Sequence, residues 1–276
     1  MEGSTSKKKQ NGKGEINQLL LFPKIMKLKF SIISVKIKND FKYGNYRNYY
    51  FKRLGAGNDQ PDLRIELMKQ YPECFKDKQV LDIGCNSGLI TINFTKSLLP
   101  KTVLGIDIDG NLIDAARKNL LRQKTDFSLA ENEILCLNKV IFRKANYILT
   151  DRSLVELEKP QYDVILCLSV TKWIHLNYGD DGIKFLFKRI FKQLRHNGIL
   201  ILESQPFNGY KKRSKLSLEI LQNYKSIVLK PEQFEAYLLS DEIGFAESWC
   251  MTDSEILKNS NLAKGFHRPL QVFVKS

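Results

Sequence analysis

A glycine turn followed by an aspartate carries the clearest chemical information in this 276-residue chain. Residues 80–88 read Val-Leu-Asp-Ile-Gly-Cys-Asn-Ser-Gly, and nineteen residues after Gly88 the run Val-Leu-Gly-Ile-Asp ends at Asp107. Glycines let the backbone approach a ligand closely, and a helix that begins at such a turn directs free N–H groups at it. An acid at the tip of the next strand is placed to bind two ribose hydroxyls. The pattern predicts a site for a nucleoside-containing ligand.

The spacing of the two glycines narrows the class of ligand. Turns that bind dinucleotides read Gly-x-Gly-x-x-Gly, whereas this one reads Gly-x-x-x-Gly from Gly84 to Gly88. It resembles the first motif of class I methyltransferases, which bind S-adenosylmethionine. Another doubly wound nucleotide-binding domain is the alternative that this motif alone leaves open.

Strand and helix patterns alternate along the chain and must position these residues. Apolar runs predict strands at 79–83, 102–106, 140–145, 162–168 and 199–202, and a closing antiparallel pair at 245–251 and 271–275. Periodic stretches predict helices at 61–71, 111–122, 181–195, 214–225 and 231–240, and a further helix is expected to begin at the glycine turn that ends at Gly88. Residues 123–139 are predicted to form a connection. This order predicts an α/β fold with a seven-stranded, mainly parallel sheet and helices on both faces.

In such a fold the ligand binds outside the carboxyl ends of the strands. An adenine would lie between Ile108 and the corner formed by Asn146 and Tyr147, although Asn146 taken alone could simply be a turn residue. Arg64, on the helix before the first strand, is a candidate for the methionine carboxylate, because a guanidinium binds a carboxylate bidentately. A solvated helix arginine is the equally weighted alternative for Arg64. Leu168 ends the fourth strand at the same rim.

Three further segments combine aromatic and basic residues, a pairing suited to nucleic acid. They are 41–53, which holds four tyrosines; 169–178, which follows the fourth strand; and 203–213, which ends in Lys-Lys-Arg. We expect the second and third to lie at the ligand rim as loops that carry chemistry. An Asn-Pro-Pro-Tyr run is absent after the fourth strand, which argues against N6-adenine methylation.

Composition supports an intracellular protein with a polyanionic partner. Thirteen Lys and Arg residues against three acidic residues in 1–53 account for +10 of the net charge of +14. We expect residues 1–40 to form a basic, largely disordered tail and 41–276 to form the methyltransferase domain; a merely solubilising leader is the alternative for the tail. Lysines interrupt the apolar stretch 19–37, which argues against a membrane span and a signal peptide. Five irregularly spaced cysteines and three histidines predict no metal site.

Several strings together resemble the bicoid-interacting-protein family of RNA methylphosphate capping enzymes. They are Tyr43-Gly-Asn-Tyr-x-x-Tyr-Tyr50, Leu81-Asp-Ile-Gly-Cys-Asn86, Asn146-Tyr147, Leu166-Cys-Leu-Ser-Val-Thr-Lys-Trp-Ile-His-Leu-Asn177 and Gly265-Phe-His-Arg-Pro269. The family moves a methyl group from S-adenosylmethionine to the γ-phosphate at an RNA 5′ end. Tyr178 and Phe207 depart from the best known member, which has tryptophans there, and its insertion between the second and third strands is missing.

The resemblance implies a role for each matching residue. It implies that the segment 172–178 faces the RNA end. We predict that Lys172 and His175, the catalytic residues, hold the phosphates together with one or more of Lys211, Lys212 and Arg213. The resemblance implies RNA contacts from Tyr43, Asn177, Tyr178, Lys211, Lys212 and Arg213. It implies cofactor contacts from Tyr50, Arg64, Gly84, Cys85, Asn86, Asp107, Ile108, Asn146, Tyr147 and Leu168.

The expected reaction is methylation of the terminal (γ) phosphate of a small RNA, with no metal and no general base, because a phosphate oxygen is already anionic. Three alternatives stay open: a 5′-monophosphate RNA methyltransferase, a small-molecule methyltransferase, and a non-catalytic RNA-binding scaffold. The expected partners are a small non-coding RNA and possible ribonucleoprotein proteins, with the chain itself monomeric and off the membrane. Lys7-Lys8-Lys9 and the family likeness favour the nucleus, with the cytoplasm as the alternative.

Overall fold

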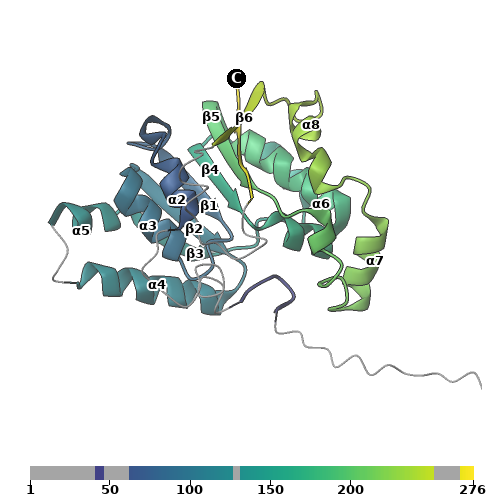
Figure 1. Ribbon diagram of the computed structural model, residues 1–276, viewed down its shortest axis with the longest axis horizontal. Coiled ribbons are helices and arrows are strands. Elements are labelled where there is room, and N and C mark those ends of the chain that lie inside the picture. The colour runs from purple at the N-terminus through teal and green to yellow at the C-terminus, as the bar shows by residue number, and fades with distance from the viewer. Residues whose placement is uncertain (1–40, 47–61, 127–130, 252–267) are drawn as a thin grey trace, which may run out of the picture. The chain divides into compact units, whose positions relative to one another are not determined.

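A computed structural model describes residues 41–46, 62–126, 131–251 and 268–276, all within one unit that takes in residues 37–276. The predictions for the tail 1–40 and for Tyr50 lie outside the described residues. The remaining chain forms a single seven-stranded sheet in the order β3-β2-β1-β4-β5-β7-β6 (Figure 1). This confirms the predicted fold class.

The parallel part of the sheet holds five strands, and two antiparallel strands complete it. β1 pairs in parallel with β2 and β4, β2 with β3, and β4 with β5, whereas β7 lies between β5 and β6 and runs antiparallel to both. The strand order reverses beside β1, so the crevice above β1 and β4 is the switch point at which α/β sheets bind ligands. The bounds are β1 Gln79–Ile83, β2 Thr102–Asp107, β3 Val140–Lys144, β4 Tyr162–Leu168, β5 Leu194–Glu203, β6 Glu247–Met251 and β7 Leu270–Val274.

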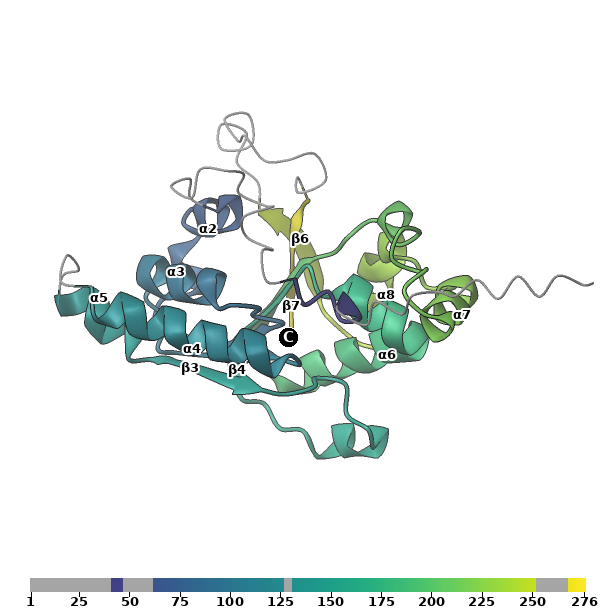
Figure 2. The same ribbon diagram turned by 90° about the horizontal axis from the view of Figure 1, so that it is seen from below.

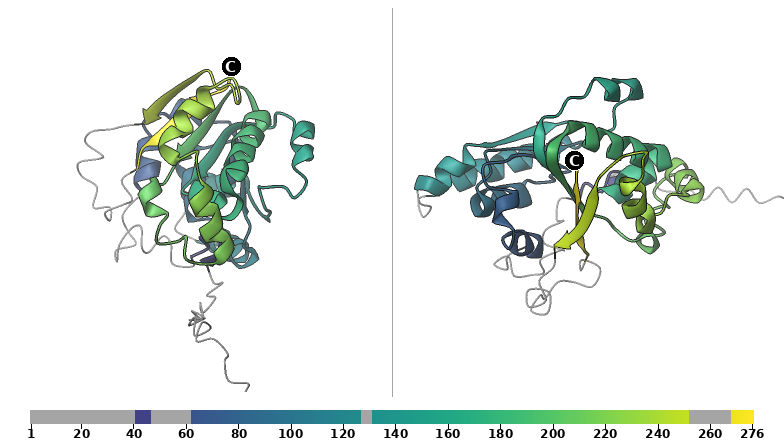
Figure 3. Two further views of the ribbon diagram at one scale, coloured as in Figure 1. Left: turned by 90° about the vertical axis from the view of Figure 1, so that its right-hand side faces the viewer. Right: turned by 90° about the horizontal axis from the view of Figure 1, so that it is seen from above.

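Alternating side chains of the strands build two separate cores. In β4, Val164 and Leu166 pack in the core that holds α2, α3 and α4, while Ile165 and Cys167 pack in the core that holds α6 and α8. A strand buried on both faces needs apolar residues at nearly every position, which is why β4 reads as a continuous apolar run. Figures 2 and 3 show the two groups of helices on opposite sides of the sheet.

The helices of the described residues begin and end close to the predicted positions, with two exceptions. Their bounds are α2 Leu63–Met68, α3 Leu89–Leu98, α4 Gly110–Lys124, α5 Glu131–Leu137, α6 Thr171–Gln193, α7 Leu218–Ser226 and α8 Phe234–Leu239. The first exception is α5, which occupies part of the predicted connection 123–139. None of these helices combines the length and the apolar run that crossing a membrane requires.

The second exception is the start of α6. We predicted a loop at 169–178 and a helix from Asp181, but helix begins at Thr171 and is broken at Gly179, whose φ of 63° and ψ of −164° are not helical. That conformation belongs to a region open essentially to glycine alone. The predicted catalytic segment is therefore a short helix with a fixed pattern of buried and exposed sides. The strand predicted at 199–202 also begins earlier than expected, because β5 runs from Leu194 to Glu203 and takes in Asn197 and Gly198.

Candidate active site

A pocket opens at the carboxyl ends of β1, β2 and β4, as predicted for this fold. Its floor is the turn after β1, where Gly84, Asn86 and Gly88 all have positive φ values between 53° and 75°. A Cβ atom at Gly84 would lie 2.4 Å from a methyl group of Val170, so this turn tolerates no larger residue. The lining residues are Tyr43, Gly44, Asn45, Tyr46, Arg64, Asp82, Gly84, Cys85, Asn86, Ile90, Asp107, Leu168, Ser169, Val170, Lys172, Trp173, Gln205, Arg213 and Arg268.

Asp107 holds the acidic end of this pocket. Its carboxylate accepts backbone N–H bonds from Asn86 and Asp109, both at 2.9 Å, so the glycine turn and the second strand are joined at the ligand rim. Burial raises the pKa of Asp107, and the bonds from the backbone oppose that rise. A carboxylate has about four acceptor positions, so two such bonds leave capacity for a pair of ribose hydroxyls.

A second carboxylate, Asp82, lies deeper in the same end. It is buried, and the Thr91 hydroxyl donates a hydrogen bond to it at 2.6 Å. Burial raises the pKa of Asp82 to about 6, while the Thr91 bond and the charge of Arg64 lower it. The negative charge of ionised Asp82 is only partly balanced by its neighbours, so a positively charged ligand would bind favourably beside it.

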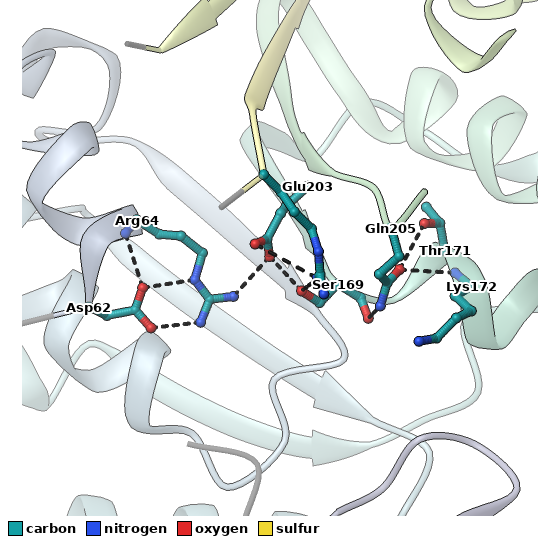
Figure 4. Close-up of polar contacts among 8 residues, drawn as sticks. Asp62, Arg64, Ser169, Thr171, Lys172, Glu203 and Gln205 are labelled. Carbon is teal, nitrogen blue, oxygen red and sulfur yellow. Dashed lines mark hydrogen bonds and ion pairs between the residues drawn. The ribbon is translucent and has the colours of Figure 1, made fainter. Parts of the chain in front are cut away.

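Arg64 is fixed between two carboxylates at the back of the pocket. Its guanidinium forms a bidentate pair with Asp62, with bonds of 2.9 and 2.8 Å, and donates to Glu203 at 3.2 Å. Figure 4 shows Asp62 and Glu203 on opposite sides of the guanidinium. The alternative of a solvated helix arginine is wrong, since Arg64 is only 3% exposed.

The other end of the pocket is basic. Lys172, Arg213 and Arg268 all line it, although they come from α6, the segment after β5, and the residues before β7. Burial lowers the pKa of Lys172 to about 8, with further lowering by the charges of Arg268 and Arg213. Three cations that repel one another in one place form a site that an anion would stabilise.

The segment 41–46 joins the two ends. The Asn86 side chain donates to the Tyr46 carbonyl at 3.3 Å, and the Arg213 guanidinium stacks 5.0 Å from the Tyr46 ring centroid. The Tyr46 ring also makes an edge contact with Trp173, with centroids 5.8 Å apart. Asn45, from the same segment, donates a short hydrogen bond to Asp109. An aromatic wall therefore stands beside both the acidic and the basic groups.

An adjoining, more apolar pocket contains the predicted adenine corner. It shares Tyr43, Gly84, Asp107 and Trp173 with the first pocket, so the two form one continuous site. The residues that belong to it alone are Ile83, Ile106, Ile108, Ala145, Asn146, Tyr147, Ile148, Ile174 and Tyr178. The Asn146 amide donates to the Tyr178 hydroxyl at 3.0 Å and accepts from the Ile148 N–H at 3.1 Å, which makes Asn146 both a turn residue and a rim group.

Four predicted residues line neither pocket. The His175 side chain is fully buried, and its Nε2 lies 2.8 Å from Asp180 Oδ1. Asn177 donates to the backbone carbonyls of Lys42 and Trp173. Lys211 and Lys212 are exposed on the surface beside Arg213. The structure therefore gathers Lys172, Arg213, Tyr43 and Tyr178 at the site and leaves these four outside its lining.

Sequence reasoning missed several polar groups that complete the site. Arg268 lies in one of the strings that resemble the family, but the sequence alone indicates no role for it, and it marks Glu203, Ser169 and Gln205 only as members of longer segments. Gln205 donates to the Ser169 carbonyl at 2.7 Å and accepts from the Lys172 N–H at 3.3 Å (Figure 4). Ser169 directly follows a predicted strand and Glu203 lies at the end of another, and these positions could have identified them as site residues.

The residues present fit S-adenosylmethionine. Asp107 suits the ribose, the buried acids Asp82 and Asp107 suit a cationic sulfonium and amine, and Arg64 suits a carboxylate. Asn45 Oδ1, which belongs to a pocket-lining residue, is buried and has no hydrogen-bond partner within the described part of the chain. An acceptor of this kind needs a donor from outside the protein or from water. Among the described residues, no three His, Cys, Asp or Glu side chains gather as metal ligands would.

Comparisons with known proteins show the family of the chain. The model of the Bicoid-interacting protein 3 (Bin3) family matches residues 162–275, and a methyltransferase domain model matches residues 81–200. The U6 snRNA methylphosphate capping enzyme Amus of Drosophila melanogaster is 46% identical over 237 residues, which cover 86% of this chain and 76% of that protein. The chain belongs to the Bin3 family. It is an S-adenosylmethionine-dependent methyltransferase, as the family resemblance and the domain match require.

Other Bin3 relatives and one solved structure set the range of similarity. The 7SK snRNA methylphosphate capping enzyme of Homo sapiens is 36% identical over 287 residues, which cover 87% of this chain but only 40% of the human protein. The pre-miRNA 5′-monophosphate methyltransferase of Danio rerio is 26% identical over 216 residues, which cover 68% of this chain and 77% of that protein. An O-methyltransferase family protein from Burkholderia thailandensis has a TM-score of 0.53 at 11% identity, with 77% of this chain and 55% of that chain covered, and so supports the fold alone.

Proposed function

We propose that this Bin3-family protein methylates the γ-phosphate at the 5′ end of a small nuclear RNA. The observation that carries the proposal is the basic end of the pocket, where Lys172, Arg213 and Arg268 face the same space as the glycine turn and Asp107. A triphosphate end carries several negative charges within a few ångströms, and a cluster of three cations complements it. The higher identity to U6 and 7SK capping enzymes than to a monophosphate enzyme supports the triphosphate end.

The protein's contribution to the reaction is binding and orientation. S-adenosylmethionine, when bound, supplies an electrophilic methyl group on a sulfonium. The phosphate oxygen is already an anion, so the side chains need not remove a proton. Lys172, Arg213 and Arg268 would hold the phosphates with one oxygen directed at the acidic end, and alignment of this kind can recover roughly 7–11 kcal/mol of the barrier.

The predicted cofactor residues keep their proposed roles. Asp107 would bind the ribose, Arg64 the methionine carboxylate, and Asn146 with Ile108 the adenine, while Tyr147 supports the corner through its hydroxyl bond to Gln193 at 2.8 Å. Tyr43 and Tyr178 stand on the rim, where an RNA base could stack.

For His175, Asn177, Lys211 and Lys212 we revise the roles. His175 and Asn177 would position α6 and the segment 41–46 from behind the pocket. Lys211 and Lys212, which are exposed, would contact the RNA backbone beyond the 5′ end. The basic residues of 1–53 extend the same electrostatic attraction, and residence in the nucleus together with a ribonucleoprotein assembly follows from the proposed substrate.

The test is methyl transfer to RNA hairpins that differ only in their 5′ end. Purified protein is incubated with S-adenosylmethionine labelled in the methyl group and with hairpins ending in triphosphate, monophosphate or hydroxyl. We expect label on the triphosphate RNA, released when the terminal phosphates are removed enzymatically. Label on the monophosphate RNA alone would move the protein to the other enzyme class, and binding without label would indicate a scaffold.

A pair of lysine variants makes this test residue-specific. Lys172→Ala should lower kcat/KM on triphosphate RNA at least 100-fold. The matched control is Lys101→Ala, since Lys101 is an exposed lysine just before β2, at the opposite edge of the sheet. Equal activity of the two variants would contradict the role of the basic cluster.

A further inference from the structure

Glu203 is a buried carboxylate that contacts residues lining both ends of the pocket. It is the last residue of β5, its side chain is 0% exposed, and it pairs in register with Leu168 at the end of β4. The Arg64 guanidinium donates to its Oε2 at 3.2 Å from the cofactor side. The Ser169 hydroxyl donates to the same oxygen from the other side (Figure 4).

Ser169 links Glu203 to Arg268, one of the three cations at the basic end of the pocket. Its Oγ accepts a hydrogen bond from Arg268 Nη1 at 2.9 Å, and that nitrogen lies 4.0 Å from Glu203 Oε1. Ser169 has a φ of 62°, an unfavourable value for a residue other than glycine, and its N–H donates to the Glu203 carbonyl at 2.9 Å. Strain of this kind persists where the surroundings fix a functional geometry.

The chain arranges this contact from distant segments. Gln271 of β7 pairs with Leu202 of β5, so Arg268, three residues earlier, passes the carboxyl end of β5. Arg64 comes from α2, before the sheet begins. One buried carboxylate thus lies between two guanidinium groups that serve different ligands in the proposed function.

We propose that Glu203 is a positioning residue that couples the cofactor site to the phosphate site. The inference rests on the proposed function. The carboxylate of a bound cofactor would attract the Arg64 guanidinium away from Glu203. The interactions of the Glu203 carboxylate with Ser169 and Arg268 would then change as well. Each ligand thereby fixes the arrangement that the other needs, so the two bind with positive cooperativity. Coupling of this kind is reciprocal, and each ligand must raise the affinity for the other by the same factor.

The experiment measures that factor. The Kd of S-adenosylhomocysteine is determined by calorimetry with and without a saturating 5′-triphosphate hairpin, and the Kd of the hairpin with and without S-adenosylhomocysteine. In the wild-type protein we expect each ligand to raise the affinity for the other about fivefold or more, so that each Kd falls by that factor. E203Q, which keeps the shape but loses the charge, should bring both ratios to within twofold of one.

A second variant guards against misfolding of E203Q. S169G removes the hydroxyl that joins Glu203 to Arg268, and it suits the left-handed backbone, so its fold should be retained. It too should abolish the coupling. D62N is the matched control, because Asp62 holds Arg64 from the opposite side; it should weaken cofactor binding and keep the coupling factor.

Four outcomes would overturn the inference: a wild-type factor near one, full coupling in a folded E203Q, full coupling in S169G, or loss of coupling in D62N to the same extent as in E203Q. The methyl-transfer assay separates this failure from failure of the proposed function. A wild-type protein that methylates triphosphate RNA without cooperative binding would overturn only the inference. Cooperative binding without methyl transfer would overturn only the proposed reaction.

Discussion

The imidazole of His175 and the carboxylate of Asp180 lie 2.8 Å apart and join the two halves of α6 across the break at Gly179. Burial lowers the pKa of His175, and hydrogen bonds from His175 and the backbone lower that of Asp180. Asp180 is therefore ionised at neutral pH, so the Nε2–H of a neutral imidazole donates to it. The other carboxylate oxygen accepts the N–H groups of Val228 and Leu229, which ties α6 to the chain after α7.

Replacement of His175 by Ala should therefore act on stability. Loss of a buried ring and of a hydrogen bond to an ionised group should lower the free energy of unfolding by about 2–4 kcal/mol. Well below the melting temperature, kcat/KM should change by less than about threefold. Urea denaturation and methyl-transfer kinetics at 15 °C check both parts. Asp180→Ala should be non-additive with His175→Ala in a double-mutant cycle; a stable His175→Ala variant with no turnover would restore the phosphate-binding role.

The break in α6 offers a test of backbone conformation alone. A Cβ atom at Gly179 would meet nothing within 4 Å, but the residue has a φ of 63°. Gly179→Ala should therefore cost about 1–3 kcal/mol through strain. Gly209→Ala is the matched control, because that position is equally open and its φ is not positive. Equal melting temperatures of the two variants would contradict the assignment of the break to glycine.

The pKa of Lys172, lowered to about 8, predicts the pH dependence of RNA capture. The protonated amine is the form that binds phosphate, so kcat/KM for triphosphate RNA should fall above about pH 8, approaching tenfold per pH unit. Lys172→Arg keeps its charge throughout this range, and its profile should stay flat to about pH 10. Steady-state rates between pH 6.5 and 10 test the assignment, and an identical fall in both proteins would assign the titration to another group.

The raised pKa of Asp82 predicts a pH effect on the stability of the fold. Its pKa is about 6 in the folded protein and 3.8 ordinarily, so the folded state binds the proton more tightly and loses stability as pH rises from about 4 to 6. Above pH 6 the ionised group costs up to roughly 3 kcal/mol. Asp82→Asn should therefore stabilise the cofactor-free protein at pH 7.5 by about 1–3 kcal/mol, and much less at pH 4.5. Urea denaturation at both values checks this, and an equal gain at both would show that ionisation is not the cause.

The sheet and the cofactor end could be predicted because local patterns determine them. Continuous apolar runs identified β1, β2 and β4, and the Gly84–Gly88 turn and Asp107 each lie directly at a strand end. A residue at the carboxyl end of a parallel strand reaches the rim whatever the rest of the chain does. Arg64 was also predicted, although its two carboxylate partners were not.

The basic end could be predicted only in part, because tertiary contacts determine it. Lys172 followed from its segment, but that segment is the first part of a helix, and His175 lies on its buried side. Arg268 reaches the pocket only because β7 returns antiparallel between β5 and β6. No local period in the sequence reports such a return.

The position of β7 also has a consequence for the order in which the molecule can be made. Every strand from β1 to β6 precedes it in the chain, yet β6 joins the sheet solely through β7 in the described residues. A growing chain therefore carries an open sheet edge at β5 until residue 274 has left the ribosome, and Arg268 arrives with that last strand. Long-range closure of this kind is slow and leaves an exposed edge. Nascent chains interrupted before residue 268 would be candidates for chaperone binding and would lack methyltransferase activity.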